Sequence, residues 1–161
     1  MPHAPAAKNH TELVVWQLCS QLRALVLKYT RSARVREDRR YYTDIRAAAR
    51  SACYLTSEGF YRKRDGDFQN FLVWARGSLG EVSDQVSDGQ QEGYFSAEQA
   101  EQMISLVKRS MAASRRLREY LQSARQQGTA KRPIARKTLR HRGPAERAHR
   151  KANRPLGNQS R

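Results

Sequence analysis

The sequence predicts an all-α protein, an up-and-down antiparallel four-helix bundle followed by a disordered basic C-terminal tail. Apolar residues recur every three or four positions in four segments, which places them on one side of a 3.6-residue helix. No segment shows a convincing strand pattern. The end of the chain is strongly basic and nearly free of large apolar residues. We therefore divide the chain into a flexible N-terminus (1–10), the bundle (11–125) and the tail (126–161).

The first predicted helix has six apolar residues on one side: Val15, Leu18, Leu22, Leu25, Val26 and Tyr29. Asn9 followed by Glu12 offers a capping box at its start. A second apolar row widens the apolar arc beyond what one core-facing side requires, and it consists of Trp16, Cys19 and Leu27. We expect part of this helix to face another subunit.

The second predicted helix carries an alanine-rich stripe: Tyr41, Ile45, Ala48, Ala52 and Leu55. Small side chains allow a neighbouring helix to approach closely, and Gly59 ends the stripe. The third predicted helix starts at Asp67 as its cap and ends near Gly89 and Gly93. Its stripe is Phe68, Phe71, Leu72, Ala75, Leu79, Val82 and Val86. Because glycine destabilises a helix interior, Gly77 and Gly80 indicate tight backbone packing or a local bend.

The fourth predicted helix begins at Ser96, with Gln99 three residues later as a second capping box. Its stripe is Met103, Val107, Met111, Ser114, Leu117 and Leu121. Helices joined by short connections pack antiparallel, so four such stripes make an up-and-down bundle.

Positive charge is unevenly distributed along the chain. It carries 31 Lys and Arg against 15 Asp and Glu, a net charge of +16. Eleven of the basic residues and only one acid lie in residues 126–161, together with three prolines, three glycines and no aromatic residue. Such a segment buries too little apolar surface to offset the entropy of ordering, so we predict that it is disordered. The remaining residues hold all thirteen aromatic side chains, as expected for one domain.

Several short motifs in the predicted bundle resemble one bacterial family. They are Leu13-Val-Val-Trp16-Gln17, Ser57-Glu58-Gly59, Phe71-Leu72 and Ala75-Arg-Gly77-Ser78-Leu79-Gly-Glu81. In order and spacing they resemble the four helix bundle protein family, which includes proteins encoded by intervening sequences of 23S ribosomal RNA genes. The family is related to the accessory variability proteins of diversity-generating retroelements. The resemblance covers residues 11–125.

The resemblance implies a small helical protomer that assembles into a homopentameric, barrel-like ring with a basic surface. In the retroelement branch, that ring binds the reverse transcriptase and nucleic acid. The chain departs from the family pattern at Ser51-Ala-Cys53-Tyr54-Leu55-Thr56-Ser57, where the family has a proline and an asparagine. The basic tail lies outside the matched region. Glu58 and Glu81 fall within the matched motifs, and we expect them to cap or to pair with arginine.

The sequence does not indicate an enzyme, a cofactor or a metal site. Di-iron bundle enzymes need two Glu-x-x-His pairs and two further glutamates, whereas this chain has one such spacing, from Glu146 to His149 in the tail. All four histidines lie outside the predicted helical core, so none can act as a base beside a core serine or cysteine. No phosphate-cradling or dinucleotide-binding glycine motif occurs.

The two cysteines, Cys19 and Cys53, lie far apart in the sequence with no histidine near either. This spacing fits neither a disulfide framework nor a zinc site, so we expect two buried free thiols. No apolar run approaches the roughly 18 to 20 residues that a membrane span needs, and the first residues do not form a secretory signal. We expect a cytoplasmic protein without a membrane partner.

The groups that can carry function are cationic. Arg39, Arg46 and Arg50 fall within about 40° of one another on the second predicted helix. A basic turn follows it, Arg62, Lys63 and Arg64, and the last helix carries Lys108, Arg115 and Arg118 along one edge. The tail adds Lys131, Arg132, Arg136, Lys137, Arg140 and Arg142.

For any single one of these residues, a solvated surface with local ion pairs, such as Arg40 with Asp44 or Arg115 with Glu119, is the better interpretation. Together they predict a polyanionic partner, because each neutralised phosphate releases condensed counterions. Five aromatic residues in or near the second helix can stack on unpaired bases, although core packing is favoured for them: Tyr41, Tyr42, Tyr54, Phe60 and Tyr61.

Three functions therefore remain open at the level of sequence. The favoured one is a non-enzymatic, oligomeric nucleic-acid-binding accessory protein, with a reverse transcriptase as a possible partner and RNA or DNA as the ligand. The alternative is a protein-interaction scaffold of the intervening-sequence type without direct nucleic-acid function. A metal-dependent bundle enzyme is the least favoured.

Overall fold

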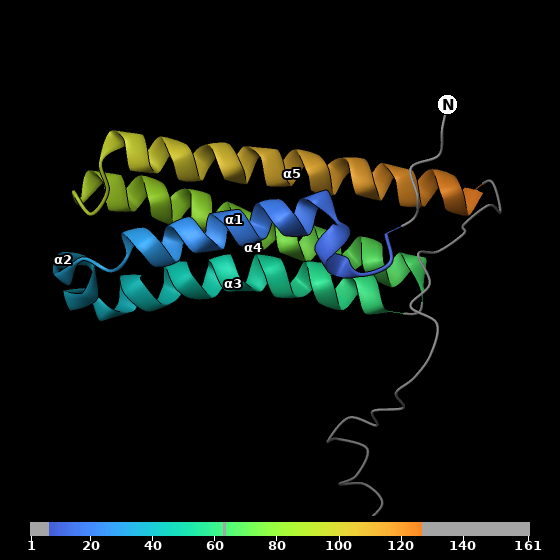
Figure 1. Cartoon of the computed structure of the whole chain (residues 1–161), viewed down its shortest axis with the longest axis horizontal. Helices are drawn as coiled ribbons and strands as arrows, with labels where there is room; N and C mark the ends of the chain where they lie inside the picture. Colours follow the sequence, from blue (N-terminus) through green and yellow to red (C-terminus); the bar gives the residue numbers. More distant parts are fainter. Residues whose placement is uncertain (1–6, 63, 127–161) are drawn as a thin grey trace, which may run out of the picture.

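Four long antiparallel helices form a bundle in the computed structural model, which describes residues 7–62 and 64–126 (Figure 1). They are α1 (Val14–Tyr29), α3 (Arg39–Tyr61), α4 (Asp65–Gln91) and α5 (Ala97–Gln126). Two short elements precede α1 and α3, the 3-10 helix η1 (His10–Glu12) and α2 (Ala33–Glu37). No strand occurs in the described ranges. The predicted all-α four-helix bundle is confirmed, and the predicted tail lies outside the described residues apart from Gln126, the last residue of α5.

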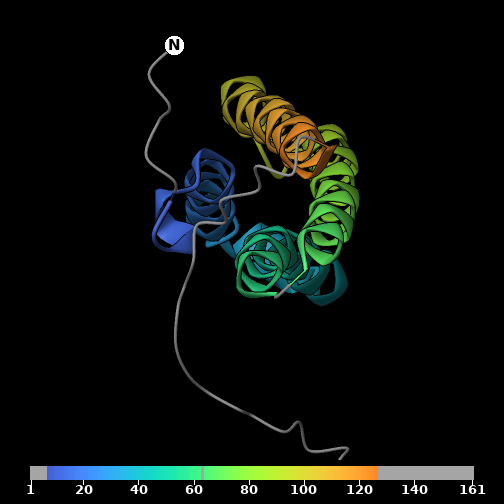
Figure 2. The ribbon, with the colours of Figure 1, turned by 90° about the vertical axis from the view of Figure 1, so that its right-hand side faces the viewer.

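Each long helix packs against two others (Figure 2). α1 contacts α3 and α5, and α4 contacts the same two helices. α1 and α4 are therefore diagonal to each other, as are α3 and α5. This arrangement leaves four outer faces, and the face formed by α1 and α3 lies on the opposite side of the bundle from the one formed by α4 and α5.

The core lies along the bundle axis and draws residues from all four long helices. The largest fully buried apolar side chains include Leu22, Ile45, Leu72, Leu79 and Met103. Burying such a side chain contributes about 1.5–3 kcal/mol. Cys19, from the second apolar row of α1, is also fully buried, so that row contributes to the core of its own protomer.

Helix capping follows the prediction at the start of one helix, α5, and departs from it at the starts of two others, α1 and α4. At α5, Ser96 Oγ accepts a hydrogen bond from the Gln99 backbone N–H at 3.2 Å, and the Ser96 backbone N–H donates to Gln99 Oε1 at 3.0 Å. That capping box is confirmed. The box of Asn9 and Glu12 caps η1 instead, because the Asn9 side chain accepts from Thr11 N–H. α1 begins after Leu13 without a side-chain cap.

Asp67 is not a cap, and this prediction was wrong. α4 starts at Asp65 after Arg64, and the Asp67 N–H already donates to the Arg64 carbonyl at 3.0 Å. Its carboxylate thus lies in the first turn, where the helix dipole favours negative charge without a capping hydrogen bond.

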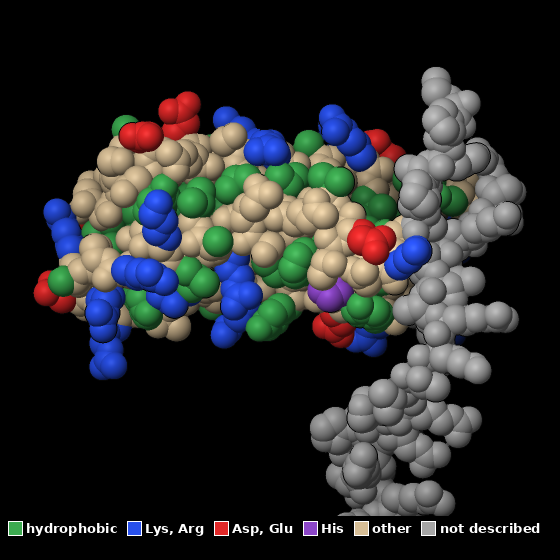
Figure 3. All heavy atoms as spheres, in the orientation of Figure 1, with side chains coloured by type: hydrophobic (Ala, Val, Ile, Leu, Met, Phe, Trp, Pro, Cys, Tyr) green, Lys and Arg blue, Asp and Glu red, His purple; other side chains and the backbone are tan. Residues whose placement is uncertain are grey.

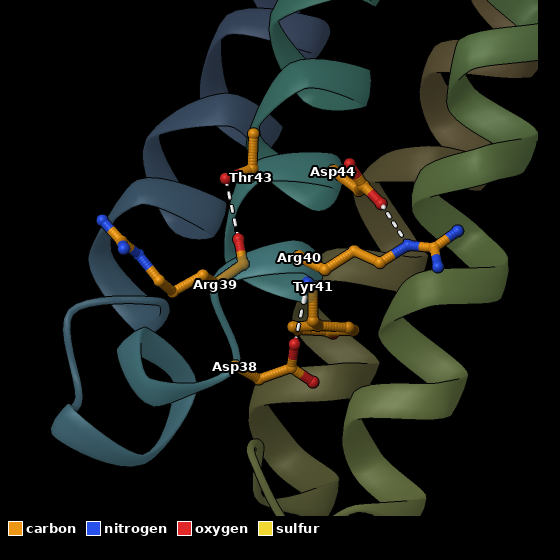
Figure 4. Close-up of polar contacts among 6 residues, drawn as sticks. All are labelled: Asp38, Arg39, Arg40, Tyr41, Thr43 and Asp44. Carbon is orange, nitrogen blue, oxygen red and sulfur yellow. Dashed lines mark hydrogen bonds and ion pairs between the residues drawn. The ribbon is translucent and has the colours of Figure 1, made fainter.

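The segment between α1 and α3 holds α2, which the apolar pattern did not predict. Ser32 caps this short helix, and its single buried residue, Val35, is fully enclosed. α3 begins two residues before Tyr41 because Asp38 Oδ1 accepts from the Tyr41 backbone N–H at 3.0 Å (Figure 4). It ends at Tyr61, two residues after Gly59.

The glycines of the bundle have two different environments. A Cβ at Gly59 would lie 2.6 Å from Phe71 Cβ, so this glycine lets α3 and α4 approach closely. A Cβ at Gly77 or Gly80 would meet no atom within 4 Å. The prediction of tight packing at these two positions is therefore wrong within the protomer, because both lie on the outer side of α4.

Candidate nucleic-acid interface

Charge is distributed unequally over the four long helices. α1 contains no acidic residue, whereas α4 contains five acids and one basic residue, Arg76. α3 contains four arginines and two acids, and α5 contains six basic residues and three acids. In the space-filling view, where α1 lies in front with α3 below it, basic side chains extend along the face and acidic ones lie toward its edges (Figure 3). The excess of positive charge thus lies on α1, α3 and α5 rather than on α4.

We use the name α1/α3 basic face for the surface that carries Arg23 of α1 together with Arg39, Arg46 and Arg50 of α3. None of the four forms an ion pair with a described acid. Arg39 and Arg40 extend to opposite sides of α3, and Arg40 reaches toward α4 (Figure 4). Arg40 pairs with Asp44 of its own helix, as predicted, at 3.7 Å.

Arg46 is the most firmly held cation of this face. Its guanidinium lies 4.5 Å from the centroid of the Tyr42 ring, and Nη1 donates to the Tyr42 hydroxyl at 2.6 Å and to Thr30 Oγ1 at 3.5 Å. Thr30 is itself fully buried, and its hydroxyl donates to the Val26 carbonyl at 2.7 Å. The remaining donors of a guanidinium stay available for an anion that approaches from solvent.

The predicted basic turn is partly neutralised. Arg62 pairs with Glu58, as expected for that acid, and lies 5.0 Å over the Phe71 ring. Arg64 is exposed at the start of α4. Lys63 lies outside the described residues.

The predicted residues of α5 lie apart from those of α3, because the two helices are diagonal in the bundle. Lys108 and Arg115 are exposed, and Arg115 pairs with Glu119 at 3.8 Å, as predicted. Arg118 is half-buried, and its Nε is enclosed without a described hydrogen-bond partner. The six predicted tail residues from Lys131 to Arg142 lie outside the described residues. The structure thus brings the α3 arginines together and separates them from the α5 group.

Two aromatic residues differ from the expectation of core packing. Phe60 is buried, and Tyr41 and Tyr42 are half-buried, but Tyr54 and Tyr61 keep 57% and 53% of their surface exposed. The sequence did hold a signal for Tyr54, because it follows Arg50 by four residues and so lies on the same side of α3 as the arginine row.

Arg23 was missed by the sequence analysis. Its guanidinium carbon lies 6.0 Å from the centroid of the Tyr54 ring. The signal that could have found it is the complete lack of acids in α1, which leaves this arginine without a partner on its own helix.

The two thiols of the bundle are enclosed. Cys19 and Cys53 are free and buried, as predicted. Burial, with the nearby Cys53 adding to it, raises the pKa of Cys19 to about 12, and burial raises the pKa of Cys53 to about 11 despite the opposing charge of Arg23. Both thiols therefore remain protonated near neutral pH, and a protonated thiol is a poor nucleophile. Among the described residues, no group of three or more His, Cys, Asp or Glu can hold a metal ion.

A comparison with protein families identifies the family of this chain. Residues 11–114, more than half of its length, match the model of the 23S rRNA-intervening sequence protein family. The chain belongs to this family. No curated protein matches it. The intervening-sequence match spans α1 to α4 and ends within α5, so the resemblance seen in the short motifs is confirmed. None of the helices that the structure describes is long and apolar enough to cross a membrane.

Proposed function

We propose that this member of the intervening-sequence family is a non-enzymatic accessory protein that binds nucleic acid through its α1/α3 basic face. The observation that carries the proposal is the arginine row Arg39, Arg46 and Arg50, which faces an acid-free helix and pairs with no described acid. Arginine suits this role because its planar guanidinium binds phosphate oxygens bidentately. The net charge of +16 strengthens the attraction at long range.

Such a surface contacts the phosphate backbone and reads little sequence. Each phosphate that is neutralised releases counterions, so the affinity falls steeply with salt. Phosphate contacts fix the position of a nucleic acid without distinguishing its bases. Specificity then comes from the shape of the nucleic acid or from a protein partner. A reverse transcriptase is the partner that the resemblance to retroelement accessory proteins implies, and a reverse-transcriptase gene next to this one would favour that role.

The test is a double substitution on the basic face. Arg39→Gln with Arg50→Gln removes two exposed cations without touching the Arg46 contacts. Arg40→Gln with Arg125→Gln is the matched control, because it removes the same charge from the α4 side of α3 and from the last turn of α5. Binding of labelled RNA and DNA oligonucleotides is measured by fluorescence anisotropy over a series of salt concentrations.

We expect the double variant of the basic face to lower the slope of log affinity against log salt by about 0.7 to 0.9 per lost contact. The control changes the slope less. No binding at about 50 mM salt, or an equal loss in both double variants, contradicts the proposal.

The outer face of α4 favours a second function for this protein, association with another protein chain. Val73 and Trp74 remain 44% and 54% exposed there, beside the open Gly77. Exposed aromatic surface next to a helix glycine is typical of a protein contact. The same face carries exposed acids, Glu81, Asp84 and Asp88.

The occupant we propose for this face is a second copy of the chain. α5 presents the complementary charge, and its exposed basic residues include Lys108, Arg109, Arg115 and Arg116. A contact of α4 with α5 of the next copy is head-to-tail, and such contacts close into rings when the rotation allows it. This supports the homo-oligomer, a pentamer, that the resemblance implies, and it leaves the α1/α3 basic face free.

Trp74→Glu tests the assembly by light scattering after size exclusion, with Tyr54→Glu as the control at a similarly exposed aromatic residue of α3, outside the proposed contact of α4 with α5. We expect the Trp74 variant to be monomeric and the control to assemble. Wild-type protein that is monomeric, or a Trp74 variant that assembles normally, contradicts the proposed contact.

A further inference from the structure

Aromatic rings and arginines alternate along the α1/α3 basic face. Arg46, Arg50 and Tyr54 follow one another at intervals of four residues on α3, so they form one row on the helix surface. Tyr61 follows Tyr54 by seven residues. Seven residues make nearly two full turns, which sets Tyr61 about 20° from Tyr54 around the helix and about 10 Å further along it.

Both exposed rings contact a side chain from another element. Arg23 of α1 lies over Tyr54 at 6.0 Å. The Tyr61 hydroxyl lies 3.0 Å from Nδ1 of His10, and the edge of the His10 ring meets Trp16 at a centroid distance of 5.0 Å. The row thus ends in an aromatic cluster of His10, Trp16 and Tyr61, adjacent to the basic turn.

This pattern distinguishes between classes of nucleic acid. A duplex presents its phosphates to solvent but keeps its bases paired and stacked, so exposed tyrosines add little to its binding. A single strand presents both, and proteins that bind single strands combine a positively charged track with aromatic rings on which the bases stack. Stacking tolerates any sequence because every base has a π face.

We propose that the α1/α3 basic face binds a single-stranded nucleic acid, whose unpaired bases stack on Tyr54 and Tyr61 while Arg39, Arg46 and Arg50 contact its phosphates. This inference rests on the proposed function and names its ligand class. The exposed aliphatic Val73 and the exposed Trp74 lie on α4, on the other side of the bundle. Arg23 lies over Tyr54, which follows Arg50 by one helical turn, and Tyr61 is followed directly by Arg62. Both rings therefore lie among cations, which favours nucleic acid over a protein partner.

The experiment uses Tyr54→Ala and Tyr61→Ala, singly and together, with Tyr120→Ala as the matched control. Tyr120 is as exposed as Tyr54 but lies on α5, outside the basic face. Tyr54→Phe and Tyr61→Phe retain the rings and serve as rescue variants. The full-length proteins are titrated into labelled oligo(U), oligo(dT), duplex RNA and duplex DNA of equal length, and thermal unfolding by circular dichroism verifies the fold of each variant.

We expect the wild type to bind the two single strands more tightly than either duplex. Each alanine substitution should weaken single-strand binding about 5- to 150-fold, with an unchanged salt slope and unchanged duplex binding. The phenylalanine variants and Tyr120→Ala should bind like the wild type. The oligo(U) and oligo(dT) arms show which sugar the face prefers, and either preference agrees with stacking.

Three results overturn the inference. They are duplexes that bind as tightly as single strands, tyrosine variants that bind single strands like the wild type, and tyrosine variants that lose self-association instead of nucleic acid. In each case the proposed function survives if Arg39→Gln with Arg50→Gln still lowers the salt slope. If the wild type binds none of the four probes at low salt, the proposed function itself fails.

Discussion

The hydroxyl of Tyr41 on α3 donates a 2.6 Å hydrogen bond to the backbone carbonyl of Gln85 on α4. The ring packs over Gly89, where an added Cβ would collide with the hydroxyl. Burial, followed by the charges of Asp88, Tyr94 and Asp38, raises the pKa of Tyr41 well above its usual range. The phenol therefore remains a hydrogen-bond donor, and it joins α3 to α4 at the end of the bundle where α4 approaches its turn into α5.

Tyr41→Phe keeps the ring and removes only this hydrogen bond. We expect it to lower the free energy of unfolding by about 1 kcal/mol, because the Gln85 carbonyl loses a partner in a partly buried site. Urea unfolding followed by circular dichroism measures the change. Tyr120→Phe, which removes an exposed hydroxyl, is the control and should leave the stability unchanged. An equal effect of the two substitutions contradicts the importance of the contact.

The two thiols predict a pH dependence of stability. The pKa of Cys19 is raised to about 12 and that of Cys53 to about 11, from a usual 9.0. Above about pH 9 the unfolded chain therefore loses thiol protons that the folded chain retains, so the free energy of unfolding falls as the pH rises. Below that pH both states hold these protons, and the thiols contribute no slope.

The measurement is the urea midpoint from about pH 8 to about pH 11, with Cys53→Ala as a variant whose decline should be shallower. A disulfide-exchange reagent gives an independent readout at the lower pH. We expect slow labelling of native protein and rapid labelling once urea unfolds it. Native thiols that react as fast as unfolded ones contradict the burial of both groups.

Gly59→Ala tests the close approach of α3 and α4. The new Cβ would lie 2.6 Å from Phe71 Cβ and 2.7 Å from Phe68 Cδ2, so one helix must shift. Overpacking of this kind lowers stability by about 1–3 kcal/mol. Gly77→Ala is the matched control, because nothing lies within 4 Å of its new Cβ. By helix propensity it should stabilise the protomer by about 0.5–1 kcal/mol, and the opposite order of the two variants contradicts the packing at Gly59.

Deletion of residues 127–161 tests the contribution of the basic tail. The deletion removes eleven Lys and Arg and one acid, while the bundle up to Gln126 remains. We expect weaker nucleic-acid binding with a shallower salt dependence, since fewer counterions are released. The thermal unfolding of the bundle and its oligomeric state should not change. Loss of the oligomer on truncation contradicts the assignment of the tail to nucleic acid alone.

The sequence by itself determined the helical class, the four long helices, the capping box at Ser96 and the burial of both thiols. These features depend on periodicity and local chemistry, which a single segment carries whatever its neighbours are. The sequence pattern did not predict α2 because only one of its five residues, Val35, is buried. One buried residue is too few to show a helical periodicity.

Only the tertiary structure decided how residues beside each stripe are used. Tyr54 and Gly77 illustrate this, since both occupy positions that suggested packing, and both face solvent in the protomer. A helical stripe identifies the centre of the buried side, but the neighbouring helices decide how far burial extends around it. The diagonal placement of α3 and α5 likewise separated arginines that the linear sequence could not assign to different faces, because the order of helices around a bundle depends on long-range packing.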